Sequence, residues 1–102
     1  MQKTNETFLR EALYDAIYAA TFSPEKEYGI FFDENGLPYH DRCKDFSTPL
    51  ISFSFTKDFI RKYICIDEYL NKFYDEFIEE YYYNHIDDII EDLVKRKEIS
   101  FD

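Results

Sequence analysis

The sequence has no tryptophan and only two glycines, three prolines and two cysteines among its 102 residues. So little glycine and proline excludes a loop-built chain, and two cysteines exclude a disulfide scaffold. No apolar run approaches the roughly 20 residues that cross a bilayer. Residues 1–6 also lack the charged-then-apolar layout of a signal peptide. We therefore expect a soluble, intracellular protein.

Aromatic residues are abundant instead, with 11 Phe and 10 Tyr making up 21% of the chain. Together with a hydrophobic fraction of 45%, this is enough core-forming material for a folded protein, although 33% of the residues are charged. The length is that of one ordinary domain, so we expect residues 1–102 to form a single domain. A two-lobed enzyme with a cleft between its lobes is excluded.

The first segment carries an apolar stripe at spacings of three and four, which predicts a helix. Asn5 is expected to cap its beginning, and Ser23-Pro24 to end it, because proline lacks a backbone donor and disfavours helix just before itself. The stripe consists of Phe8, Leu9, Ala12, Leu13, Ala16, Ile17 and Ala20.

Three strands are predicted next, over residues 28–32, 37–40 and 50–55. Asn35-Gly36 is a strong hairpin-turn signal between the first two, since both residues tolerate positive φ. Pro38 favours an edge position for the second strand. In the third, apolar Ile51, Phe53 and Phe55 alternate with serines, as in a half-buried strand.

A second helical stripe runs from Phe59 to Tyr81, after Thr56 as the expected N-cap, and then changes phase. One straight helix cannot bury both parts of the stripe against one core, so we expect a break near Asn84 and a further helix to about residue 97. Whether residues 60–66 are helix or strand stays open, because Ile64 to Ile66 also fits a strand. The predicted fold is α+β, with the order αβββαα and helices covering one face of a three-stranded antiparallel sheet.

The net charge of −10 is concentrated in one quarter of the chain. Residues 67–92 carry ten acids against one base, Lys72. A surface of this kind repels nucleic acid and anionic membranes and attracts basic partners. On the predicted helix, Asp75, Glu76, Glu79 and Glu80 oppose the aromatic stripe, so they should face solvent.

Three consecutive aromatic residues, Tyr81 to Tyr83, point in three directions on a helix and cannot all enter one core. Tyr82 and Tyr83 should be partly exposed, either as anchors of an interface or as a cover for the junction between the last two helices. The candidate partner-binding residues are Asp75, Glu76, Glu79, Glu80, Tyr82, Tyr83, Asp87 and Asp88.

No motif indicates catalysis or a cofactor. His40, Cys43, Cys65 and His85 could in number hold a zinc ion, but their spacing does not match the paired ligands of structural zinc sites. We expect both thiols to be reduced and unliganded. The acids lie on a predicted solvent-exposed face. Acid–base catalysis needs two carboxyl groups whose environments give them different pKa values, and such a face provides no difference of this kind. The prediction is therefore a non-enzyme without metal or cofactor.

The favoured function is an interaction or inhibitor protein that presents acidic and tyrosine side chains to a basic site on another protein, for example a nucleic-acid-processing enzyme. In size and charge alone, the chain resembles the small acidic inhibitors of CRISPR nucleases and restriction enzymes encoded by phages and mobile elements, some of which mimic DNA. That resemblance would place the protein in the cytoplasm of a bacterial host. The alternatives are an antitoxin-like or regulatory partner that binds through an apolar surface, and an acidic face that only confers solubility.

Overall fold

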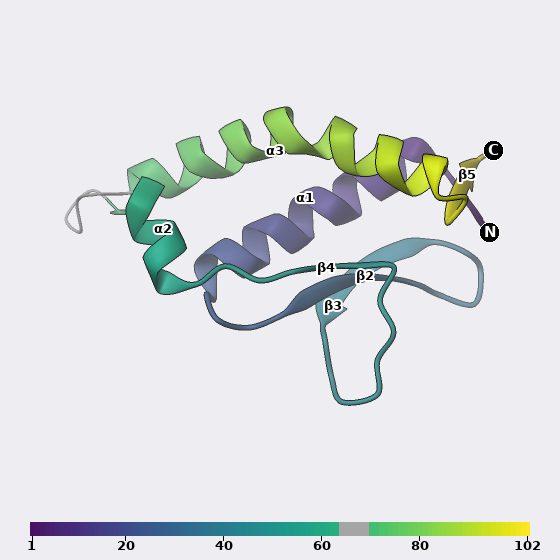
Figure 1. Cartoon of the computed structure of the whole chain (residues 1–102), viewed down its shortest axis with the longest axis horizontal. Coiled ribbons are helices and arrows are strands. Elements are labelled where there is room, and N and C mark those ends of the chain that lie inside the picture. The colour runs from purple at the N-terminus through teal and green to yellow at the C-terminus, as the bar shows by residue number, and fades with distance from the viewer. Residues whose placement is uncertain (64–69) are drawn as a thin grey trace.

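A computed structural model describes residues 1–63 and 70–102 of the chain, which form an α+β fold (Figure 1). The α+β class and the three-stranded antiparallel sheet agree with the sequence prediction. The elements in chain order are β1 (Gln2–Thr4), α1 (Glu6–Phe22), β2 (Tyr28–Phe32), β3 (Pro38–Arg42), β4 (Ile51–Phe53), α2 (Lys57–Tyr63), α3 (Leu70–Lys95) and β5 (Ile99–Phe101).

The sheet has the strand order β3-β2-β4, with both pairs antiparallel. Asp33 closes the turn between β2 and β3, because its carboxylate accepts hydrogen bonds of 2.9 Å from the backbone amides of Asn35 and Leu37. Gly36 adopts the positive φ that the turn requires. The edge position inferred from Pro38 is confirmed, since β3 lies at one edge of the sheet.

Helix α1 lies between the sheet and α3 (Figure 1). Its first turn is capped as predicted, because the Asn5 side chain accepts hydrogen bonds from the backbone amides of Thr7 and Phe8. Every side chain of the apolar stripe predicted for this helix is buried except Phe8, which is exposed. The helix ends at Ser23, directly before Pro24, also as predicted.

The two ends of the chain form a parallel pair, β1 with β5, which the sequence analysis did not predict. Gln2 pairs with Ile99 and Thr4 with Phe101, and the side chains of Thr4 and Ile99 are buried. Strands of three residues carry too little alternation to be recognised locally. The observed order therefore has one additional strand at each end of the predicted αβββαα.

The predicted break near Asn84 is wrong, because α3 runs unbroken from Leu70 to Lys95 and Asn84 lies on its exposed surface. Helix α2 begins after Thr56, whose hydroxyl accepts a hydrogen bond of 3.1 Å from the amide of Phe59, as predicted. Residues 60–63 are helical, whereas the alternative strand at 64–66 lies outside the described residues.

Spacing by four explains the apparent change of phase in α3. Four residues turn a helix through about 400°, so each step moves the row around the axis by about 40°. Such a row stays continuous while it turns gradually around the helix axis, so that its later side chains face other parts of the fold. A break in the helix is not needed. Rows of this spacing are the ridges that pack into the grooves of a second helix. Helix α1 carries a matching row of fully buried side chains. The row of α3 is Ile78, Tyr82, Ile86 and Ile90, and that of α1 is Leu9, Leu13, Ile17 and Thr21.

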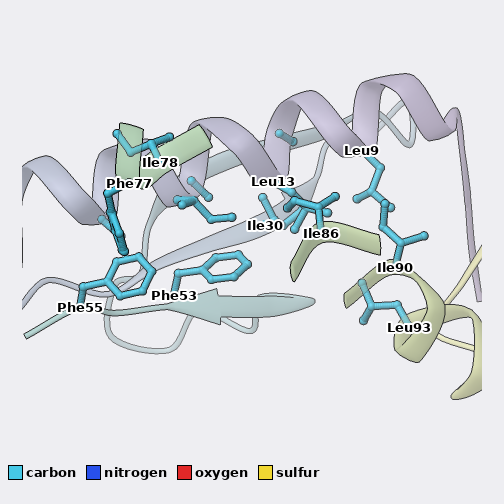
Figure 2. Close-up of a cluster of buried hydrophobic side chains, with 14 of the residues drawn as sticks. Leu9, Leu13, Ile30, Phe53, Phe55, Phe77, Ile78, Ile86, Ile90 and Leu93 are labelled. Carbon is cyan, nitrogen blue, oxygen red and sulfur yellow. The ribbon is translucent and has the colours of Figure 1, made fainter. Parts of the chain in front are cut away.

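The core is one elongated cluster between the two long helices and the sheet (Figure 2). At one end the ring of Phe55 makes edge contacts with Phe77 and Tyr81, at centroid distances of 6.2 and 5.3 Å. At the other end lie Leu93 and Ile90 (Figure 2). The early and late parts of α3 therefore bury different sides against different neighbours.

The substitution Asn84→Ala tests the continuity of α3. In a helix interior alanine is favoured over asparagine by about 0.5 kcal/mol, so the variant should be as stable as the wild type or slightly more stable. The matched control is Asn5→Ala, which removes the cap of α1 and should cost about 0.5–2 kcal/mol. Both free energies of unfolding are measured by urea denaturation. A loss of about 1 kcal/mol in Asn84→Ala would indicate a helix start at this position after all.

Candidate protein interface

All eight acids within the described part of α3 are exposed. These are Asp75, Glu76, Glu79, Glu80, Asp87, Asp88, Glu91 and Asp92. The solvent-facing placement predicted for the first four is confirmed. Two of the eight make ion pairs, Asp87 with Arg10 and Asp92 with Arg96. The other six have no ion-pair partner within the part of the chain that the structure describes.

Because α3 is continuous, the helical repeat determines which of the predicted site residues lie on the same side of the helix. Tyr83 follows Glu79 by four residues and Glu80 by three, and it precedes Asp87 by four, so these side chains are its neighbours on the helix surface. Glu76 lies seven residues earlier, about two turns away on the same side. Tyr83 is 74% exposed at the centre of this group. We call Asp75, Glu76, Glu79, Glu80 and Tyr83 the acidic face.

Asp88 does not belong to the acidic face. Nine residues separate it from Glu79, which places the two about half a turn apart around the helix axis. The two acids were predicted to lie together because both flank Tyr82 and Tyr83 in the sequence. On a continuous α3, Asp88 lies near the side of Tyr81 and His85, whose rings are 4.2 Å apart.

The Asp87 carboxylate forms an ion pair with another part of the same chain. Its carboxylate lies 2.7 Å from the Arg10 guanidinium, which also pairs with Glu6 at 3.1 Å. The hydrogen bond to Asp87 is the largest cause of the raised pKa of Arg10. The Asp87 side chain is 72% exposed, so the pair contributes only about 0.2–1 kcal/mol to stability. No local pattern indicates this link between α1 and α3, because its partners are far apart in the chain.

The two candidate tyrosines have different environments. Tyr82 is half-buried, and the edge of its ring meets Tyr14 of α1 at a centroid distance of 5.0 Å. Tyr83 packs against Tyr82 at 5.3 Å and otherwise projects outward. The alternative that both cover a junction between two helices is wrong, because α3 has no junction there. Sequence reasoning missed Tyr14, although its position beside the buried stripe of α1 placed it at the margin of the core.

Tyr14 lies beside the acidic face. Burial raises its pKa above the ordinary 10.0, and the negative charges of Glu79 and Asp75 raise it further. Both acids belong to α3, and Tyr14 of α1 meets Tyr82 of α3 at 5.0 Å, so carboxylates and aromatic rings of the two helices lie close together. Negative charges beside aromatic rings are chemically complementary to a cationic group.

The possible metal ligands do not gather at one place in the described structure. No group of three or more histidine, cysteine or acidic side chains is placed to hold a metal ion in residues 1–63 and 70–102. Cys43 is a half-buried free thiol, and burial raises its pKa, aided by the charges of Glu27 and Asp41. Cys65 lies outside the described residues, so reduced, unliganded thiols stay a prediction.

Comparison with known proteins finds no match, whether among family models, curated proteins or solved structures. In the described part of the chain, no helix has both the length and the apolar character that crossing a membrane requires. The function must therefore be argued from the surface itself.

The variant Asp75→Asn/Glu79→Gln tests whether the acids act on Tyr14. Its pKa should fall toward 10.0 but stay above it, because burial is the larger cause. A raised pKa means that the fold favours the neutral phenol, so this contribution to stability is present below pH about 10 and is lost as pH rises through the folded pKa. Titration of the tyrosine ring carbons by NMR measures the pKa. Asp88→Asn is the control, and an equal effect from it would contradict the assigned geometry.

Proposed function

We propose that the protein is an interaction protein, most specifically an inhibitor, whose acidic face binds a basic site on a partner protein. The observation that carries the proposal is the position of Tyr83, 74% exposed beside Glu79 and Glu80, which have no counter-ion within the described residues. An exposed aromatic side chain surrounded by a charged rim is the usual composition of an interface anchor. No catalytic step, metal or cofactor enters this proposal.

The two kinds of side chain would have different roles in such a complex. Tyrosine offers a large rigid area and a polar tip, so burial of Tyr83 would supply much of the affinity. Exposed ion pairs are individually weak, at about 0.2–1 kcal/mol each. Their summed field acts at longer range, and steers the approach of a basic partner. The acidic face would therefore govern the rate of association more than the rate of dissociation.

A basic groove that binds nucleic acid is the partner site that we favour, as for phage-encoded or mobile-element inhibitors of CRISPR and restriction enzymes. Mimicry of DNA would be partial. The 26 residues of α3 span about 39 Å, a length over which duplex DNA carries about 23 phosphates. The six unpaired acids on the described part of α3 give about a quarter of that charge density. Strict replacement of DNA along a groove is thus less favoured than local pairing with basic side chains.

Charge reversal of the acidic face tests the proposal, with Asp75, Glu76, Glu79 and Glu80 all changed to Lys. Each reversal adds two charges, so the four move the net charge from −10 to −2. The control variant makes the same change in net charge elsewhere on the surface. It carries Lys at the exposed positions Glu25, Glu27, Glu34 and Asp45.

Wild type and both variants are immobilised and exposed to one cell lysate, and retained proteins are identified by mass spectrometry. We expect a partner that wild type and control retain at about 0.05 M salt and release at about 0.5 M. Reversal of the acidic face should weaken its affinity by roughly several-fold to hundreds-fold, mainly through slower association. The thermal midpoint should not fall, because removal of like-charge neighbours relieves repulsion. Equal weakening in the control would show that only net charge matters.

A second candidate function is that of a small regulator or antitoxin-like partner that binds through an apolar surface. It is favoured by a groove of about 280 Å³ between α1 and the β2–β3 hairpin, lined by Phe8, Leu37 and Tyr39. These side chains are 44–46% exposed. An apolar contact depends little on ionic strength. A partner retained at high salt by wild type and by the acidic-face variant alike would therefore support this function over the first.

A further inference from the structure

A continuous row of aromatic rings crosses from α1 to α3. Phe22 stacks on Tyr18 at a centroid distance of 4.5 Å, and Tyr18 lies 6.4 Å from Tyr14. Tyr14 meets Tyr82 at 5.0 Å, and Tyr82 meets Tyr83 at 5.3 Å. The three rings of α1 are spaced by four, so they follow one another along one side of that helix. We call these five residues the aromatic ridge.

Much of the aromatic ridge is open to solvent. Tyr18 is 41% exposed, Phe22 43% and Tyr83 74%. Single exposed aromatic residues are ordinary, but a contiguous row of them marks a binding surface more often than a bare exterior.

Carboxylates flank the ridge on both helices. Asp75 and Glu79 of α3 and Asp15 of α1 all act electrostatically on Tyr14, the central ring. Each of the three is exposed. The ridge thus combines flat aromatic faces with negative charges beside them. That combination is complementary to a side chain which is both planar and cationic.

We propose that the aromatic ridge binds arginine side chains of a partner segment, with guanidinium groups lying on the rings and pairing with Asp15, Asp75 and Glu79. The inference rests on the proposed function, which it deepens by naming the chemistry of the basic partner. Arginine fits better than lysine because its guanidinium is planar, weakly hydrated and able to form two parallel hydrogen bonds with a carboxylate. The lysine ammonium is compact and strongly hydrated, and it gains less from an aromatic face.

Nona-arginine and nona-lysine peptides, equal in charge, serve as probes. The ridge variant is Tyr18→Leu/Phe22→Leu, which keeps every charge. Its control is Phe46→Leu, which removes a fully exposed aromatic ring that belongs neither to the ridge nor to the groove beside Asp15. Affinities are measured by calorimetry at about 0.05 M salt. Circular dichroism and the thermal midpoint verify that each variant is folded.

We expect wild type to bind the arginine peptide several-fold more tightly than the lysine peptide. The ridge variant should lose roughly fivefold to thirtyfold in affinity for the arginine peptide, and less than about threefold for the lysine peptide. The control should retain wild-type values. A second measurement requires no variant: ring resonances of Tyr14 and Tyr18 should shift when the arginine peptide is added to wild type, while those of Phe46 stay fixed.

Three results would overturn the inference, and they bear differently on the proposed function. If the ridge variant keeps the wild-type preference while reversal of the acidic face weakens both peptides, the ridge has no role and the acidic face stands. If the control loses the preference equally, the rings of the ridge are not specific. If neither peptide binds wild type, both the inference and the proposed function fail.

Discussion

The packing of α1 against α3 is the contact on which the other features depend. Both helices carry buried rows spaced by four, and such rows are the ridges and grooves of close helix packing. Leu13 and Ile86 lie in the middle of the core that these rows form (Figure 2). Because the row of α3 turns around the helix axis, one continuous helix packs on Phe55 at one end, through Phe77, and lies beside Leu9 at the other, through Ile90. The sheet on the far side of α1 completes the core.

The same packing determines the charge distribution of the surface. Once the apolar rows face inward, the acids between them must face outward, and little basic charge from other elements compensates them. Arg10 reaches across to Asp87, but in the described structure Glu76, Glu79 and Glu80 have no such partner. Tyr14 and Tyr82 meet where the two helices adjoin, which brings aromatic rings next to these carboxylates. A fold-determining contact thus also creates the acidic and aromatic surface to which we assign binding.

The sequence patterns correctly predicted the elements that depend on residues close together in the chain. The cap at Asn5, the hairpin turn at Asn35-Gly36 and the alternation through Phe53 all depend on residues within a few positions of one another. Features that depend on distant partners were missed, among them the pairing of β1 with β5 and the Tyr14–Tyr82 contact. The break at Asn84 was an error of a third kind. A straight stripe against one flat core would require a break there, whereas a row spaced by four can wind around the helix.

The account is tested most directly by nuclear Overhauser effects between the rings of Tyr14 and Tyr82, recorded with backbone carbon shifts for residues 81–87. With a continuous α3 packed on α1, the ring protons should show strong cross-peaks, because the centroids lie 5.0 Å apart. The backbone shifts should be helical without interruption through Asn84. Non-helical shifts at Asn84 together with absent Tyr14–Tyr82 cross-peaks would contradict the account, since the acidic face and the aromatic ridge would then not form one surface.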